Sequence, residues 1–226
     1  MRWLSRGGAA AALVVGAAVW AGLGWRGVTL LAVFLVSGSV LTRLARRGDL
    51  PRTARQVAAN GGIAALAALG GAWPVAAAAI AAAAADTWAT EIGAFARRPP
   101  RLITTGALVP AGTSGAITPL GTAGGVAGAG TLAAASAALA PHGATTAMIV
   151  AVAGVGGMLV DSLLGATVQA VYQCPACGTE SERRGTRCHG PMRLARGWAW
   201  LDNDGVNLGG TIAGALTGFI AARFSP

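Results

Sequence analysis

Apolar segments rich in alanine, glycine and valine run through almost the whole chain. Seven can be drawn, at residues 9–24, 28–41, 57–71, 74–95, 117–140, 145–172 and 198–222. A helix on the surface of a soluble protein needs a polar face, and residues 75–85 offer none. With 54% hydrophobic and 11% charged residues and a mean hydropathy of +0.59, the composition is also that of a membrane protein. The sequence therefore predicts an all-α fold, a polytopic bundle of about seven transmembrane helices.

The first three segments are short for a bilayer core of about 30 Å, which a helix of about 20 residues spans. Two of them are expected to tilt or to pack along the bundle. No cleavage site made of small residues follows the first segment, so residues 9–24 are expected to stay as an anchor. Residues 1–226 are expected to form a single membrane domain.

The arginines set the expected orientation, because all 17 basic residues are arginine and fifteen of them fall in alternate loops. These fifteen are Arg2, Arg6, Arg43, Arg46, Arg47, Arg52, Arg55, Arg97, Arg98, Arg101, Arg183, Arg184, Arg187, Arg193 and Arg196. Only Arg26 and Arg223 fall on the other side. Cytoplasmic loops carry the excess of arginine, so the amino terminus is expected in the cytoplasm and the carboxyl terminus outside, across the cell membrane.

The net charge of +9 is thus explained by topology and by attraction to anionic lipid heads. Nucleic-acid binding is not expected, since no aromatic residues alternate with the basic ones to stack on bases. Membrane lipids are the expected surroundings, and the sequence leaves a monomer and an oligomer equally open.

Three acidic residues, Asp86, Glu91 and Asp161, lie inside the apolar segments. An ionisable group at membrane depth is expensive, so it is usually paired, solvated or functional. In the expected topology Asp86 and Glu91 occupy the cytoplasmic half of the fourth segment, and Asp161 lies slightly inward of the middle of the sixth. Asn203 and Asn207, one helical turn apart, open the seventh segment. These side chains are expected to meet in one cavity at the cytoplasmic leaflet.

The connection between the fourth and fifth segments has the features of an anion site. It contains arginines at its start and the sequence Val-Pro-Ala-Gly-Thr-Ser-Gly at 109–115. Glycines let backbone amides approach an anion, hydroxyls add donors near a helix amino terminus, and arginine binds phosphate oxygens in pairs. Carboxylates beside such a loop suit Mg²⁺, which binds through one or two carboxylates and substrate phosphates. The sequence predicts a metal-dependent phosphate site open to the cytoplasm and to lipid.

Other interpretations remain open at this point. The glycine run at 124–130 is best explained by close helix packing. Asp86 as a structural partner of an arginine, and Asp161 as part of an ion or proton path, are alternatives to catalysis. A transporter also uses buried carboxylates and glycine-rich helices, but it is expected to show internal repeats, and none is evident.

Four motifs carry a resemblance to a known family: Asp-Thr-Trp-Ala-Thr-Glu-Ile-Gly at 86–93, Pro-Arg-Leu-Ile-Thr-Thr at 100–105, Val-Pro-Ala-Gly-Thr-Ser-Gly at 109–115 and Leu-Gly-Thr at 120–122. The chain resembles the integral-membrane family of phytyl-phosphate kinase and its prokaryotic homologues, long described as a domain of unknown function. Further matches lie at 56–62, 160–169, 174–178 and 200–204, so the resemblance covers nearly the whole chain. It departs at Ala116 and Ile117-Thr118-Pro119, where the family more often has Gly followed by Val-Ser-Leu.

The resemblance implies transfer of a phosphoryl group from CTP, or another nucleoside triphosphate, to an isoprenyl monophosphate of the phytyl or geranylgeranyl type. Carried onto this chain, it implies that Asp86, Glu91 and Asp161 hold Mg²⁺. It assigns phosphate binding to Arg101, Thr104, Thr105, Gly112, Thr113, Ser114 and Gly115, and the rest of the polar wall to Asn203, Asp204 and Asn207. A wider similarity to dolichol and phytol kinases and to CTP-dependent phosphatidate cytidylyltransferases keeps a second reaction open, the formation of a CDP-lipid.

A cytoplasmic loop at 173–196, between the last two segments, carries Cys174, Cys177, Cys188 and His189. Three thiols and an imidazole suit a closed tetrahedral Zn²⁺ site of structural type. The alternative is a set of reduced thiols in a flexible loop. A zinc site there would brace the loop against the phosphate site.

Overall fold

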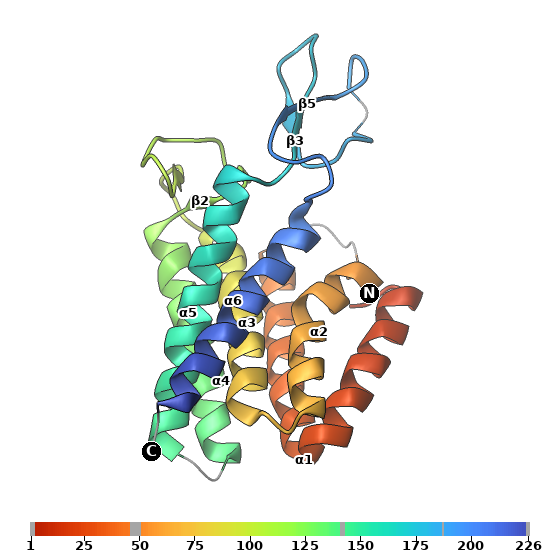
Figure 1. Cartoon of the computed structure of the whole chain (residues 1–226). Coiled ribbons are helices and arrows are strands. Elements are labelled where there is room, and N and C mark those ends of the chain that lie inside the picture. The colour runs from red at the N-terminus through yellow and green to blue at the C-terminus, as the bar shows by residue number, and fades with distance from the viewer. Residues whose placement is uncertain (1–2, 46–50, 141–142, 187, 225–226) are drawn as a thin grey trace.

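Helices form the body of the molecule in a computed structural model of the chain, which describes residues 3–45, 51–140, 143–186 and 188–224 (Figure 1). The helices are α1 (Arg6–Leu44), α2 (Ala54–Leu69), α3 (Trp73–Gly93), α4 (Pro119–Leu139), α5 (Gly143–Thr167) and α6 (Asn203–Arg223). Five of them, all but α2, are long and apolar enough to cross a membrane. The chain is therefore a mostly helical, multi-pass membrane protein.

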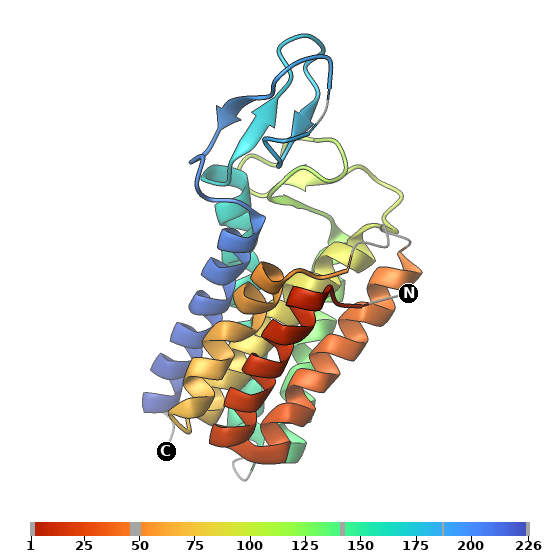
Figure 2. The same ribbon diagram turned by 90° about the vertical axis from the view of Figure 1, so that its right-hand side faces the viewer.

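Helix α1 consists of two arms. Gly24 interrupts it with φ 63° and ψ −157°, a backbone conformation that glycine adopts without strain. The chain reverses there, and the two arms run side by side in opposite directions (Figure 2). They correspond to the predicted segments at 9–24 and 28–41.

Helix α3 lies at the centre of the bundle, in contact with all five other helices. Every residue from Ala76 to Ala85 is buried, which explains why this stretch has no polar face. The small side chains allow close approach of the neighbours: a Cβ added at Gly214 would lie 2.7 Å from the Cβ of Ala82. Close packing of small residues is a usual means of association between membrane helices.

Two small sheets occur that the all-α prediction did not include. Strands β1 (Arg101–Leu102) and β2 (Ala116–Ile117) pair and close the loop between them. Strands β3 (Val171–Gln173), β4 (Glu180–Ser181) and β5 (Arg193–Arg196) form a three-stranded sheet in the order β4-β3-β5. This sheet and its connections, residues 168–202, make a lobe between α5 and α6.

The helix boundaries beside this lobe correct the sequence prediction. The segment drawn to residue 172 ends as a helix at Thr167, because Val171 and Tyr172 pair with β5. Tyr172 is buried with Cys174 and Met192 in a separate apolar cluster. The last helix begins at Asn203 instead of 198, where the side chain of Asp202 caps it by accepting from the amide of Gly205.

The two ends of the bundle differ. The lobe, the loop at 94–118 and the described amino-terminal residues lie at one end, while the carboxyl-terminal end of α6 lies at the other (Figures 1 and 2). Arg26, beside the Gly24 turn, and Arg223, at the end of α6, belong to that second end. Four of the arginines that were predicted on the cytoplasmic side lie outside the described residues: Arg2, Arg46, Arg47 and Arg187.

Candidate functional site

A cavity of about 800 Å³ lies at the lobe end of the bundle. Its walls come from α3, α4, α5, the start of α6, the loop at 94–118 and the lobe. Of the predicted site residues it brings together Asp86, Gly112, Thr113, Ser114, Gly115, Asp161 and Asn203. Two of the three predicted membrane carboxylates, Asp86 and Asp161, therefore lie in one cavity with the glycine loop.

Asp86 on α3 and Asp161 on α5 both line this cavity, and both also line a smaller cleft beside it. The Oδ2 atom of Asp161 is buried and has no hydrogen-bond partner among the described residues. Neither aspartate forms a salt bridge within that part of the chain. Two adjacent carboxylates and a buried oxygen without a partner fit a hard divalent cation such as Mg²⁺, which takes oxygen ligands.

Amide side chains lie beside the two aspartates. Asn60 of α2 and Asn207 of α6 line a small cleft with Asp86 and Asp161. Four helices thus contribute polar groups to one position, with Asn60 as a residue that the sequence prediction missed. Asn60 lies in the motif at 56–62, which is part of the family resemblance but to which the sequence analysis assigned no function.

Asp204, by contrast, lies outside the cavity. Its Oδ2 atom is 3.7 Å from the Nε atom of Arg55, whose Nη2 atom lies 2.8 Å from Asp202. These ion pairs tie the start of α6 to α2.

Glu91 also does not line the cavity, although it lies on the same helix as Asp86. Five residues at 3.6 per turn place it about 140° away around the helix axis. Its Oε1 atom accepts a hydrogen bond of 2.8 Å from the Thr42 hydroxyl of α1, and its Oε2 atom is buried without a partner among the described residues. In this position Glu91 connects α3 to α1.

Arg52 extends into the same region, and nothing in the sequence marked it among the loop arginines. Its guanidinium lies 5.8 Å from the centre of the Phe34 ring, and a Cβ added at Gly38 would lie 2.9 Å from its Nη2 atom. Burial lowers the pKa of Arg52, and the negative charge of Glu91 opposes that shift. The charge of Arg52 therefore offsets that of Glu91 at the α1–α3 contact.

The glycine loop, residues 112–115, is shaped by positive φ angles of 88° at Gly112 and 75° at Gly115. Gly115 packs so closely on the backbone of Ala166 in α5 that a Cβ has no room. The Thr113 hydroxyl donates to the Pro110 carbonyl oxygen over 2.8 Å, and the Ser114 hydroxyl donates to Glu182 over 2.5 Å. The loop leads into α4, whose amino terminus is capped by Thr118.

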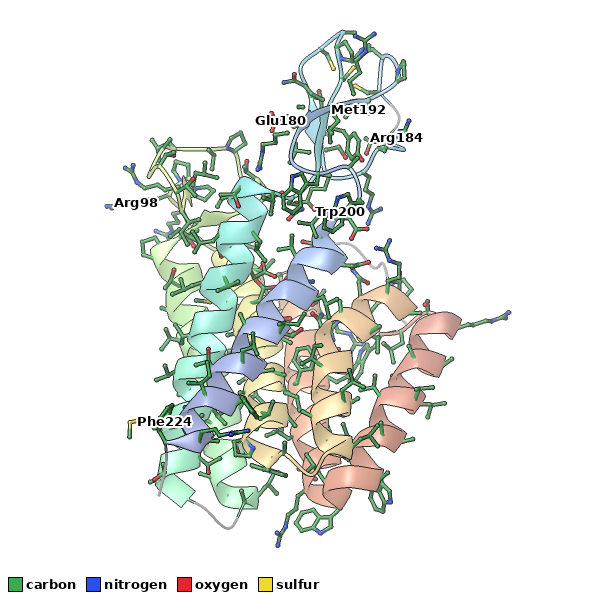
Figure 3. The ribbon with its side chains drawn as sticks, viewed as in Figure 1. Arg98, Glu180, Arg184, Met192, Trp200 and Phe224 are labelled. Atoms are coloured by element: carbon green, nitrogen blue, oxygen red, sulfur yellow. The ribbon has the colours of Figure 1, made fainter. Side chains whose placement is uncertain are left out.

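Arg101, Thr104 and Thr105 do not line the cavity. Arg101 donates to the Gly106 carbonyl oxygen over 2.7 Å, and the Thr105 hydroxyl accepts from the amide of Ala107. Arg101 and Thr105 thus stabilise the turn after β1. The arginines at the cavity are Arg97 and Arg98, which follow α3 directly; Arg98 extends outward at the rim (Figure 3).

The four predicted metal ligands of the lobe meet in space. One ligand atom each of Cys174, Cys177, Cys188 and His189 lies within 4.8 Å of the others. The Sγ atoms of Cys177 and Cys188 are 3.2 Å apart. Hydrogen bonds from Thr179 lower the pKa of the Cys177 thiol to about 6, whereas the neighbouring Cys177 raises the pKa of Cys188. This Cys₃His group can hold a metal ion.

Comparison with known protein families places the chain among integral membrane proteins. The integral membrane protein DUF92 family matches residues 1–215, in agreement with the resemblance found in the motifs. No curated protein and no solved structure matches the chain significantly. Because the match covers nearly the whole chain, this protein belongs to the integral membrane protein DUF92 family.

Proposed function

We propose that the protein transfers a phosphoryl group from a nucleoside triphosphate, in the first place CTP, to an isoprenyl monophosphate, giving the diphosphate. The observation that carries this proposal is the pair of half-buried carboxylates, Asp86 and Asp161, in one cavity with the glycine loop. Carboxylates and an anion-binding loop are the parts that a phosphoryl transfer enzyme needs together.

Asp86 and Asp161 would hold Mg²⁺, with Asn60 and Asn207 beside them. The ion would neutralise phosphate charge. The acceptor is already a phosphate monoester, largely ionised near neutral pH, so the protein needs no strong general base. Its task is to bring two polyanions into line, and positioning and electrostatics supply most of the rate.

The glycine loop would bind the phosphates through its backbone amides and the Thr113 and Ser114 hydroxyls. Arg97 and Arg98 at the rim add positive charge for the incoming nucleotide. Arg101, Thr104 and Thr105 would support the loop from outside the cavity. Asn203 lines the wall on the α6 side.

We further propose that the chain crosses the cell membrane seven times, with α2 and each arm of α1 counted as a crossing. The cavity end carries most of the arginines and would face the cytoplasm. The amino terminus would then lie in the cytoplasm and the carboxyl terminus outside. This orientation gives the cavity access to cytoplasmic nucleotides.

Zn²⁺ is the metal proposed for the Cys₃His group. Thiolate and imidazole ligands in a closed set of four are typical of structural zinc. The expected effect is to hold the tip of the β3–β4 hairpin, since Cys174 and Cys177 lie in its turn and Cys188 joins them from the following loop.

Analysis of products tests the proposed reaction. The purified protein is incubated with Mg²⁺, CTP labelled at the γ-phosphate and an isoprenyl monophosphate. The proposal expects labelled isoprenyl diphosphate together with CDP, and no such product from the D161N variant. The same assay with uniformly labelled CTP would show a CDP-lipid and pyrophosphate if the protein were a cytidylyltransferase. Absence of both products with a range of isoprenyl phosphates would rule out both enzymatic functions and favour transport.

A further inference from the structure

Arg196 of the lobe makes hydrogen bonds to two other parts of the cavity wall. The Nη1 atom of Arg196 donates to the carbonyl oxygens of Gly165 and Ala166, over 3.1 and 2.9 Å, and its Nη2 atom donates to that of Ser114 over 3.4 Å. The first two carbonyls belong to the last turn of α5, where helix carbonyls lack intrahelical partners. Arg196 therefore joins the lobe, α5 and the glycine loop in a fixed arrangement.

This arrangement brings a third carboxylate into the cavity. Glu182 directly follows β4, at the base of the hairpin whose tip carries Cys174 and Cys177. It lines the cavity together with Asp161 and accepts the hydrogen bond from Ser114. Glu182 forms no salt bridge within the described ranges.

A carboxylate in this place is unfavourable if the loop binds phosphate alone. Like charges repel, and the Ser114 hydroxyl has a single proton, which Glu182 already accepts. A divalent cation between the carboxylate and the phosphate removes the conflict, because carboxylate and phosphate oxygens are its preferred ligands together. The buried Oδ2 atom of Asp161, without a described partner, is independent support for a ligand in the same cavity.

We infer that Glu182 is a third carboxylate of the divalent-cation site, supplied by the lobe and oriented by the Ser114 hydroxyl. The inference rests on the proposed function, since it completes the cation site at Asp86 and Asp161. The inference also gives the lobe a role in cation binding. The Cys₃His group would fix the tip of the β3–β4 hairpin, and Glu182 lies at the base of the same hairpin.

Direct cation binding tests this inference without any assay of turnover. Mn²⁺ is titrated into the detergent-solubilised full chain, and the free ion is measured by electron paramagnetic resonance. One equivalent of Zn²⁺ is added first so that the thiols do not take up Mn²⁺. The E182Q variant keeps the size of the side chain and removes its charge; its dissociation constant for Mn²⁺ is expected to rise about 10-fold or more. The E182D variant, which keeps the charge on a shorter side chain, is expected to fall between E182Q and the unchanged protein.

The matched control is E180Q. Glu180 lies two residues away on β4, is exposed on the lobe (Figure 3) and does not line the cavity. Its variant is expected to bind Mn²⁺ like the unchanged protein. Thermal unfolding of all variants shows whether the lobe stays folded.

The outcomes separate the inference from the proposed function. If D161N abolishes saturable binding and E182Q leaves it unchanged or tighter, Glu182 is not a ligand and the inference is wrong, while the cation site stands. If D161N binds Mn²⁺ as the unchanged protein does, the cation site of the proposed function is wrong as well. A loss of affinity shared equally by E182Q and E180Q would mean a general charge effect and would also overturn the assignment.

Discussion

At the scale of single residues, the three acidic groups in the apolar segments have different surroundings. Asp86 and Asp161 line the cavity, whereas Glu91 accepts a hydrogen bond from Thr42 of α1. Helical periodicity alone separates Asp86 from Glu91 on α3. The same sequence feature, a carboxylate in an apolar segment, therefore occurs in two structural roles: a group that lines the cavity and a group that connects two helices.

This difference predicts unequal effects of neutral substitutions. D86N and D161N are expected to lower turnover at least 100-fold, because each removes a charge beside the reacting phosphates; such single electrostatic contributions are commonly worth about 10²–10³ in rate. E91Q keeps an acceptor for Thr42 and is expected to keep most of the activity. It leaves Arg52 without a counter-charge, so a lower thermal stability is expected. Turnover and unfolding temperature in the same detergent measure both effects, and E91Q as inactive as D86N would contradict the assignment.

At the scale of elements, the sequence predicted a helical membrane segment where α3 lies and the meeting of Asp86, Asp161 and residues 112–115. Apolar length and spacing along a helix set these features locally. The sequence prediction was wrong where contacts between residues far apart in the chain determine the local structure. Val171 and Tyr172 extend an apolar run but pair with β5. Arg101 and Thr105 lie in the motif but bond within their own turn.

Arg52 and Glu182 show the same limit for the candidate site. Both lie in polar connections whose paths depend on the packed helices, so their inward positions follow from tertiary contacts that no local pattern encodes.

The lobe offers a prediction at this scale. Purified protein is expected to contain about one equivalent of zinc, as a closed four-ligand site binds one ion. C174S is expected to lose the metal and to unfold the lobe, because Cys174 is both a ligand and part of its buried cluster. Elemental analysis measures the zinc, and protease sensitivity of residues 173–196 reports on the lobe. Retention of zinc by C174S, or less than about half an equivalent in the unchanged protein, would show that the group is not a zinc site.

At the scale of the whole molecule, the charge distribution and the helix arrangement agree. The described arginines lie mostly at the cavity end, and those at the other end are Arg26 and Arg223. Arginine-rich ends of membrane proteins remain in the cytoplasm. The two described ends of the chain lie at opposite ends of the bundle, as an odd number of crossings requires (Figure 2).

Fusion reporters test this arrangement. Green fluorescent protein is expected to fluoresce on the amino terminus, which lies at the cavity end, and alkaline phosphatase to be active after Phe224, since it folds only outside the cytoplasm. A variant with arginines added after Phe224 serves as the control for the role of charge. Together with R223E, these arginines place the positive charge directly after the end of α6. Because arginine near a helix end favours retention in the cytoplasm, the phosphatase signal is expected to fall. If green fluorescent protein fused after Phe224 of the unmutated chain fluoresced, the number of crossings would be even. The assignment of both arms of α1 as crossings would then be wrong first, because an arm that lies along the membrane surface removes one crossing without changing the cavity.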